Sequence, residues 1–143
     1  MLHMEKNQTY LEATLKFISQ KGYETDDNEF FKATSKFLSE LFNVDYVLIN
    51  KYSAKTPKNI ETVTIYNRDR FIPNISYDLA NTPCENVINK VFCVYPNNVQ
   101  ALFPKDELLA QMNIDSYIAT PLWSSTRQSI GLIGYANKIW SLS

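Results

Sequence analysis

Hydrophobic positions along the chain follow two periods, one typical of helices and one typical of strands. In residues 4–21, apolar side chains recur at helical spacing, and Gly22 follows as a stop signal. Residues 26–43 predict a second helix, with acidic side chains in its first turn and Asn43 as a left-handed terminator. Both apolar stripes are wide enough to pack on a sheet or on a second copy of the chain.

Strand-like alternation follows the second helix. Residues 44–52 (VDYVLINKY) and 60–66 (IETVTIY) are β-branched and aromatic, and a polar turn separates them. Residues 114–123 and 129–137 predict a second hairpin near the end of the chain. A short strand is expected near residues 71–77, where the pattern is less regular.

The segment TPCE, in the middle of the chain, has the signature of a helix start. Thr82 is a suitable cap, Pro83 fits the first helical position, and Glu85 stands where a capping box places an acid. An apolar strip at helical spacing then begins at Cys84 and includes Val87. This helix is expected to pack its apolar strip, with the thiol of Cys84 in the first turn, against another element that the pattern does not identify.

The remaining segments complete an α+β pattern. Residues 92–95 predict a short strand, residues 99–103 another extended piece, and residues 104–112 a helix. Strands outnumber crossover helices, and hairpins occur at both ends. The pattern therefore favours a central antiparallel sheet of five to six strands with helices packed against its faces.

Composition narrows the class of protein. The 143 residues suit one domain, and their formal net charge of −1 argues against a nucleic-acid or anionic-membrane partner. The longest apolar stretch, residues 130–136, is far too short for a membrane span, and the first residues lack a signal-peptide block. Two cysteines are too few for a disulfide scaffold, so we expect reduced thiols in the cytoplasm.

The same counts weaken most enzyme chemistries. Three glycines form neither a GxxxxGK[ST] nor a GxGxxG phosphate cradle. The single histidine, His3, makes a Ser-His-Asp triad or a Cys-His dyad improbable. One histidine and two cysteines are too few ligands for a zinc site. No cofactor is predicted.

Four linked segments between residues 81 and 132 carry a family resemblance. TPCENV, VYPNNVQALFPKDELL, DSYIATPL and SIGLIG, in this order and spacing, resemble GAF domains of bacterial sensor histidine kinases and diguanylate cyclases. The resemblance implies a PAS-like, profilin-like fold with a ligand pocket on one side of the sheet. It implies terminal helices on the other side that form a homodimer and relay to an output domain. Residues 1–143 are then expected to be a single GAF domain from a longer signalling chain, without its C-terminal helix and output domain.

Two departures from the family pattern bear on structure and ligand. Arg127 stands where the family usually has a glycine in the last hairpin turn. The NK…F…DE signature of cyclic-nucleotide relatives is absent, and Cys84 is followed by Glu85 rather than by the histidine of bilin-binding relatives. The resemblance therefore disfavours both ligand classes.

The candidate ligand-binding residues lie in the predicted strands and in the TPCE helix. Tyrosine combines apolar area with one polar group, which suits a small-molecule pocket. The thiol of Cys84 lies in the first turn of its helix, where the helix dipole lowers a pKa while Glu85 and burial raise it. The alternative for each residue is an ordinary core or surface role. The candidates are Tyr66, Tyr77, Cys84, Val87, Tyr95 and Tyr117.

Three functional hypotheses follow. The first is a non-catalytic sensory domain that binds an unidentified small molecule and relays its state to an output domain of the same chain. The second is a structural dimerisation module without a ligand. The third, disfavoured, is a cysteine-dependent reductase of free methionine sulfoxide, using Cys84 and Cys93, because some proteins of this fold catalyse that reaction.

Overall fold

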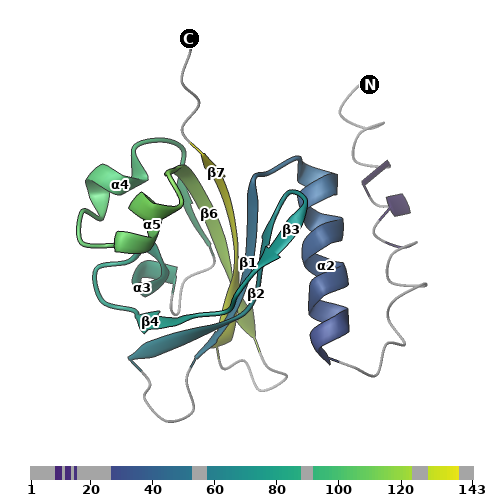
Figure 1. The fold of residues 1–143 in the computed structure, drawn as a ribbon, viewed down its shortest axis with the longest axis horizontal. Coiled ribbons are helices and arrows are strands. Elements are labelled where there is room, and N and C mark those ends of the chain that lie inside the picture. Colours follow the sequence, from purple (N-terminus) through teal and green to yellow (C-terminus); the bar gives the residue numbers. More distant parts are fainter. Residues whose placement is uncertain are drawn as a thin grey trace.

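The computed structural model describes residues 9–10, 12–13, 15, 27–52, 58–87, 92–123 and 129–138. These residues form three layers, in which an antiparallel sheet lies between helices on either side (Figure 1). Helix α2 (Asp27–Phe42) covers one face of the sheet. The short helices α3 (Pro83–Val87), α4 (Val99–Leu102) and α5 (Glu107–Gln111) cover the other, which we call the front face. The expected α+β plan is thus confirmed.

Within the described residues the sheet has seven strands, in the order β3-β2-β1-β7-β6-β5, with β4 also paired to β2. This exceeds the expected five to six because the nine-residue β2 pairs with β3 at one end and with β4 at the other. Every pairing is antiparallel. The strands are β1 (Tyr46–Tyr52), β2 (Asn59–Asn67), β3 (Arg70–Ile72), β4 (Ser76–Asp78), β5 (Cys93–Tyr95), β6 (Ile114–Trp123) and β7 (Ser129–Lys138).

The register of β1 against β2 decides which side chains reach the front face. Directly opposite residues share a face, so Leu48 and its partner Ile65 point to the front. Val47 and its partner Tyr66 point toward α2. Between the pairs Ile49–Thr64 and Asn50–Thr62, β2 contains one extra residue, a bulge that reverses the parity of β2. The front face therefore holds odd-numbered residues of β2 on one side of the bulge and even-numbered residues on the other.

The main core lies between the sheet and the front helices. Its members are apolar side chains from β1, β2, β6 and β7 together with side chains from α3, α4 and α5 and the loops before them. They are Tyr46, Leu48, Ile60, Ile65, Leu79, Cys84, Val99, Leu109, Ile114, Tyr117, Ala119, Leu132 and Ala136.

Helix α2 ends as its sequence predicts. Asn43 has a φ of 53°, the left-handed conformation that stops the helix. The hydroxyl of Ser39 donates to the carbonyl of Val44 (3.1 Å), and the amide of Val44 donates to the carbonyl of Ser39 (3.3 Å). The chain then enters β1 directly.

The TPCE signature forms a helix, but its cap differs from a capping box. Pro83 begins α3 as expected. The hydroxyl of Thr82 donates to the carbonyl of Leu79 (2.7 Å), and the carboxylate of Glu85 accepts from the amide of Asn81 (2.9 Å). The acid therefore reaches back one residue further than in a capping box, and the threonine closes the turn before the helix.

The expectation of an extended piece at residues 99–103 is wrong, because the chain forms α4 there. Asn98 has a φ of 54°, which turns the backbone sharply before the helix. The side chain of Val99 is fully buried and anchors this helix turn in the core. Alternation of apolar and polar residues over so short a segment does not distinguish one helical turn from a strand.

Some sequence predictions fall on residues that the structure does not describe. Of the helix predicted for residues 4–21, only Thr9, Tyr10, Glu12, Ala13 and Leu15 are described, and all five are helical. The continuation of α3 beyond Val87 and the turn at Arg127 lie outside the described residues. None of the helices in the described segments has the length and apolar character needed to cross a membrane.

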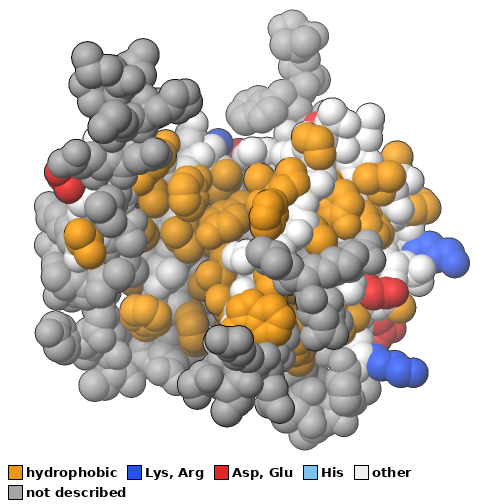
Figure 2. Space-filling model, turned by 180° about the vertical axis from the view of Figure 1, so that it is seen from behind, with side chains coloured by type: hydrophobic (Ala, Val, Ile, Leu, Met, Phe, Trp, Pro, Cys, Tyr) orange, Lys and Arg blue, Asp and Glu red, His pale blue; other side chains and the backbone are white. Residues whose placement is uncertain are grey.

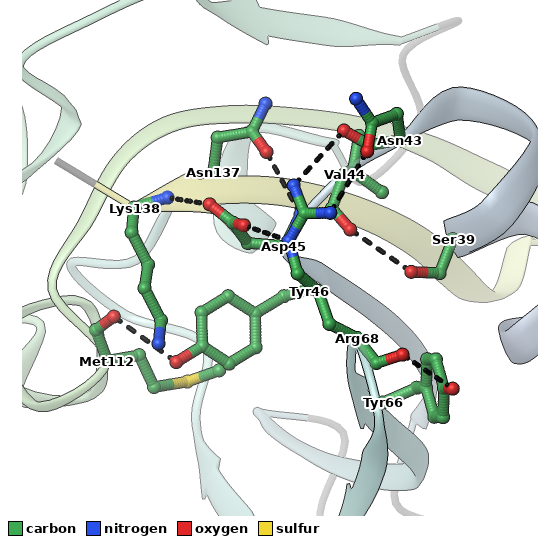
Figure 3. Close-up of polar contacts among 10 residues, drawn as sticks. All are labelled: Ser39, Asn43, Val44, Asp45, Tyr46, Tyr66, Arg68, Met112, Asn137 and Lys138. Carbon is green, nitrogen blue, oxygen red and sulfur yellow. Dashed lines mark hydrogen bonds and ion pairs between the residues drawn. The ribbon is translucent and has the colours of Figure 1, made fainter. Parts of the chain in front are cut away.

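A buried carboxylate joins four parts of the chain (Figure 3). Asp45, only 3% exposed, accepts hydrogen bonds from Nε of Arg68 and from the backbone amide of Lys138 (2.7 Å). The amide of Asp45 donates to Oδ1 of Asn137 (3.0 Å). The guanidinium of Arg68 also donates to the side chain of Asn43 (3.0 Å). Asp45 thus ties the end of α2, the start of β1, the β2–β3 turn and the end of β7.

The contact with Asp45 accounts for an unusual turn residue. Arg68 has a φ of 50°, a conformation that favours glycine and costs other residues roughly 1–2 kcal/mol. Glycine would remove this strain but would also remove the guanidinium that pairs with Asp45. The hydroxyl of Tyr66 donates to the carbonyl of Arg68 (2.7 Å) and further fixes the turn.

We expect Asp45→Asn to lower the free energy of unfolding by about 2–3 kcal/mol, measured by urea denaturation. Both carboxylate oxygens of Asp45 accept hydrogen bonds, so an asparagine must turn its amide NH₂ toward either Arg68 or the Lys138 amide. One buried donor then faces another donor.

The matched control is Glu61→Gln, in the exposed pair Lys51–Glu61 with an N···O distance of 3.9 Å. Exposed pairs contribute about 0–1 kcal/mol, so this variant should unfold close to the wild type. Equal stabilities of the two variants would show that the Asp45 network adds nothing.

Candidate functional site

A groove on the front side runs between the segment that leads into α3 and the loop that joins α4 to α5. It has two adjoining lobes, of about 430 Å³ and 290 Å³, which share Asn81, Thr82 and Lys105. The larger lobe is also lined by Ile75, Tyr77, Asp78, Ala80, Asp106, Glu107, Leu108 and Gln111. The smaller lobe is also lined by Glu85, Leu102, Phe103 and Pro104.

Next to the larger lobe lies a small chamber of about 20 Å³, room for roughly one water molecule. Its walls come from β1, β4, α3, α5 and β6 and include Leu48, Cys84 and Tyr117. Tyr77, Asp106 and Leu108 line both the chamber and the larger lobe. These three side chains therefore form the partition between groove and chamber.

A chain of polar side chains crosses the core at the partition. The Nδ2 of Asn50 donates to the hydroxyl of Tyr77 (3.0 Å). The Sγ of Cys84 lies 3.4 Å from the hydroxyl of Tyr77 and 3.4 Å from that of Tyr117. Asn50, Cys84 and Tyr117 are each at most 4% exposed. We call these four residues the Asn50–Tyr117 cluster.

A glycine on β7 gives Tyr117 its place in this cluster. A Cβ atom at Gly134 would lie 2.5 Å from the Tyr117 hydroxyl, closer than any real contact. The ring therefore lies over β7 at a point where no side chain projects. Larger residues at position 134 would push the phenol away from the Cys84 thiol.

Burial keeps the cluster neutral. It raises the pKa of the Cys84 thiol, although hydrogen bonds from Tyr117 and Tyr77 act in the opposite direction. Burial also raises the pKa of Tyr77 and that of Tyr117 well above their usual value. At neutral pH the cluster is thus a chain of uncharged groups, and it lacks the thiolate that cysteine catalysis needs.

Asp106 brings a carboxylate to the partition. Its Oδ1 accepts from the amides of Leu108 (3.1 Å) and Leu109 (3.3 Å) and so caps α5. Burial raises the pKa of Asp106, and the two backbone hydrogen bonds lower it. A partly buried carboxylate in this position favours a cationic or hydrogen-bond-donating neighbour.

The structure brings together three of the six candidate residues, Tyr77, Cys84 and Tyr117. Tyr95 lies opposite Tyr117 on the same sheet face, and its ring packs edge-on against Phe103, which lines the smaller lobe (5.3 Å between centroids). For Val87 only the backbone, in α3, is described.

Tyr66 lies apart from the other candidates. Strand parity turns it toward α2, and its ring packs against Phe71 rather than against the front helices (4.8 Å between centroids). Regular alternation over residues 60–66 would put Tyr66 on the same face as Ile60, but the bulge in β2 puts the two residues on opposite faces.

Sequence reasoning missed Asn50 and the groove residues Lys105 and Glu107 as parts of the site. Asn50 had a visible signal, since it is a polar residue within the apolar run VDYVLINKY. A buried polar residue in a core strand needs a partner, and here that partner is Tyr77. The loop residues carried no signal, because their position depends on how α4 and α5 fold back over the sheet.

Comparison with solved structures identifies the fold as that of GAF domains. The A. aeolicus NLH2 GAF domain in an inactive state matches with a TM-score of 0.71 at 12% identity, over 95% of this chain and 83% of that one. The chromophore-binding domain of Stigmatella aurantiaca phytochrome P1 matches with a TM-score of 0.70 at 15% identity, over 93% of this chain and 52% of that one.

The GAF domain of Acinetobacter phosphoenolpyruvate-protein phosphotransferase matches with a TM-score of 0.65 at 11% identity, over 94% of this chain and 81% of that one. No family model and no curated protein matches the sequence. The expected GAF-like fold is therefore confirmed at the level of architecture.

We expect Ellman's reagent to label Cys93 at least tenfold faster than Cys84 in the native protein at pH 8. Cys84 is buried with a raised pKa, whereas Cys93 is half-buried. Labelling of Cys84 then requires local opening and should accelerate in sub-denaturing urea. Single Cys84→Ser and Cys93→Ser variants assign the two rates. Equally fast labelling of both thiols would contradict the burial of Cys84.

Proposed function

We propose that this chain is a sensory GAF domain that binds a small molecule in the two-lobed groove. The observation that carries the proposal is the partition of Tyr77, Asp106 and Leu108, which line both the larger lobe, of about 430 Å³, and the small chamber next to it. Ligand sites typically measure about 300–1,000 Å³ and combine apolar walls with a few polar groups. The larger lobe has this size, and polar side chains make up most of its lining, with Ile75, Ala80 and Leu108 among the apolar residues.

A sensory role fits the chemistry better than catalysis. The thiol of Cys84 is buried and protonated, so reduction of methionine sulfoxide has no ready nucleophile at this position. The domain is proposed to be non-catalytic and to act in the cytoplasm, since Cys84 and Cys93 are both unbridged. The S. aurantiaca neighbour is a chromophore-binding domain, but the Cys84-Glu85 pair of this chain does not favour a bilin.

A route for the signal runs through β7 to the helices. Tyr117 lies over Gly134, and the next residue, Tyr135, projects from the other face of the sheet. The ring of Tyr135 packs edge-on against Phe42 at the end of α2, and Phe42 packs against Tyr10 (5.6 and 6.0 Å between centroids). We propose that movement of the Asn50–Tyr117 cluster reaches the N-terminal helix through these contacts. From that helix the change is relayed to a histidine kinase or diguanylate cyclase output domain.

A dimer completes this proposal. Leu15 is 57% exposed on the N-terminal helix, and Val94 and Ile118 are exposed on the sheet face that α2 leaves open. Seen from behind, hydrophobic side chains gather across the molecular surface (Figure 2). Exposed apolar surface of this kind suits a contact between two copies.

The ligand hypothesis is tested by thermal unfolding with a panel of small metabolites. A ligand at about 100 times its Kd stabilises by roughly 2.7 kcal/mol, which raises the Tm by roughly 5–10 °C. Ala80→Trp should remove this shift, because Ala80 is exposed and lines the larger lobe. Ala110→Trp, exposed on α5, is the control outside the groove lining. A shift that persists in Ala80→Trp would place the ligand elsewhere.

The dimer is tested by sedimentation. Wild type should sediment as a dimer and Leu15→Asp as a monomer, because a buried carboxylate at an apolar interface is unfavourable. Glu12→Gln, at an exposed position on the same helix, should leave the dimer intact. A monomeric wild type would remove the dimer from the proposal and leave the ligand site untouched.

A further inference from the structure

The chamber next to the larger lobe has the volume and the walls of a site for one water molecule. Its volume is about 20 Å³, and a cavity needs roughly 10–15 Å³ to hold one water. None of the residues that line it is exposed. An ordered water needs roughly two to four polar partners. Four of the lining residues have polar side chains, namely Tyr77, Cys84, Asp106 and Tyr117.

A second observation places the carboxylate of Asp106 near the other polar groups of the chamber. Burial is the main reason that the pKa values of Tyr77, Cys84 and Tyr117 are raised, and the negative charge of Asp106 raises all three further. One charge acts on three buried groups because it lies within range of each. Hydrogen bonds from the amides of Leu108 and Leu109 hold the carboxylate in this place.

The hydrogen bonds of the Cys84 thiol can run in either direction. Between Sγ of Cys84 and the hydroxyl of Tyr117 (3.4 Å), either atom can be the donor, and the same holds for Cys84 and Tyr77 (3.4 Å). Hydroxyl groups, thiols and water all both donate and accept. A chain of such groups has two arrangements, related by reversing every hydrogen bond, and the group at its end selects one of them.

We propose that the chamber binds one water molecule, which links the carboxylate of Asp106 to the hydroxyl of Tyr117 and so connects the groove to the core. When Asp106 is ionised, the water donates to it and accepts from Tyr117, whose oxygen accepts from the Cys84 thiol. When Asp106 is protonated, each of these three hydrogen bonds reverses. This inference rests on the proposed function, because it gives the groove a route to the ring that lies over Gly134.

The proton state of Asp106 depends on the groups that share the groove and the chamber with it. Burial raises its pKa, so Asp106 takes up a proton at a higher pH than an ordinary aspartate. An occupant of the larger lobe that changes this pKa would therefore also change the direction of the hydrogen bonds in the core. The titratable and charged neighbours are Tyr77 and Asp78 from β4, Cys84 from α3, Tyr117 from β6, Lys105 from the loop before α5, and Glu107 from α5.

The first test is a crystal structure of the unliganded protein at a resolution that shows ordered water. One water oxygen is expected about 2.5–3.0 Å from both the Asp106 carboxylate and the Tyr117 hydroxyl. A well-ordered chamber without this oxygen, or an oxygen that reaches only one of the two groups, would overturn the inference.

The second test follows the reversal by ¹H–¹⁵N spectra recorded between about pH 3 and pH 8, a range that spans the titration of a carboxyl with a raised pKa. The amides of Leu108 and Leu109 donate to Asp106 and report its protonation directly. The amide of Gly134, which lies beneath the Tyr117 hydroxyl, should shift with the same midpoint. A Gly134 amide that does not follow Asp106 would contradict the link.

A matched pair of variants separates the water link from the direct field of Asp106. Tyr117→Phe keeps the ring and removes the hydroxyl, so Gly134 should lose its shift while Leu108 still titrates. Tyr95→Phe is the control, because Tyr95 lies opposite Tyr117 on β5 and does not line the chamber. In this variant Gly134 should titrate as in the wild type. A Gly134 shift that persists in Tyr117→Phe would show that the charge acts through space, without the water.

Asp106→Asn supplies a test that does not touch the core. Asparagine still caps α5 but does not titrate, so Leu108, Leu109 and Gly134 should all lose the shift. Asp115→Asn should leave it unchanged, since Asp115 accepts from the amide of Asn98 (2.9 Å) and lines neither the groove nor the chamber. A Gly134 shift that remains in Asp106→Asn would belong to another acid and overturn the inference. The metabolite panel with Ala80→Trp tests the groove ligand separately, because its result does not depend on the water.

Discussion

The carboxylate of Asp45 fixes the relation between β1 and the segments around it. Asp45 lies between the end of α2 and the start of β1. Its carboxylate accepts hydrogen bonds from Arg68 in the β2–β3 turn and from Lys138, the last residue of β7. The two strands that flank β1, β2 and β7, are thus each fixed at one end by the same buried carboxylate. Since a slip of one residue would turn every side chain to the opposite face, the position of this end determines what the front face contains.

The composition of the site follows from that register. With Asp45 fixed, Leu48 and Asn50 face the front helices, and β7 presents Gly134 beneath Tyr117. Gly131 shows how closely the strands approach, since a Cβ there would lie 2.0 Å from the carbonyl oxygen of Asn50. The side-chain amide of Asn50 donates to Tyr77, and its Oδ1 is buried without a hydrogen bond from any described residue.

Sequence patterns predicted the architecture well and the site only in part. Helix α2, both long hairpins and the Pro83 start of α3 follow from periodicity and capping residues, which are local properties. The helix α4 was missed because its single turn depends on Asn98 and on a place in the core for Val99. The face that Tyr66 occupies could not be predicted, because the bulge at Val63 depends on pairing with β1, which the sequence of β2 alone does not reveal.

The Asn50–Tyr117 cluster is connected to α2 and the N-terminal helix by packed side chains, but packing alone does not transmit a signal. Coupling between a ligand site and the helices needs an element with two arrangements and a ligand that prefers one of them. The Asn50–Tyr117 cluster is the element that the proposed function assigns to this role. Its groups are neutral, so they can exchange partners without separating charge, and one buried acceptor is left without a protein donor. A ligand shifts such an element only by the difference between its affinities for the two arrangements. Because Tyr117 lies on Gly134 and Tyr135 lies on Phe42, a shift of the cluster changes packing on both faces of β7.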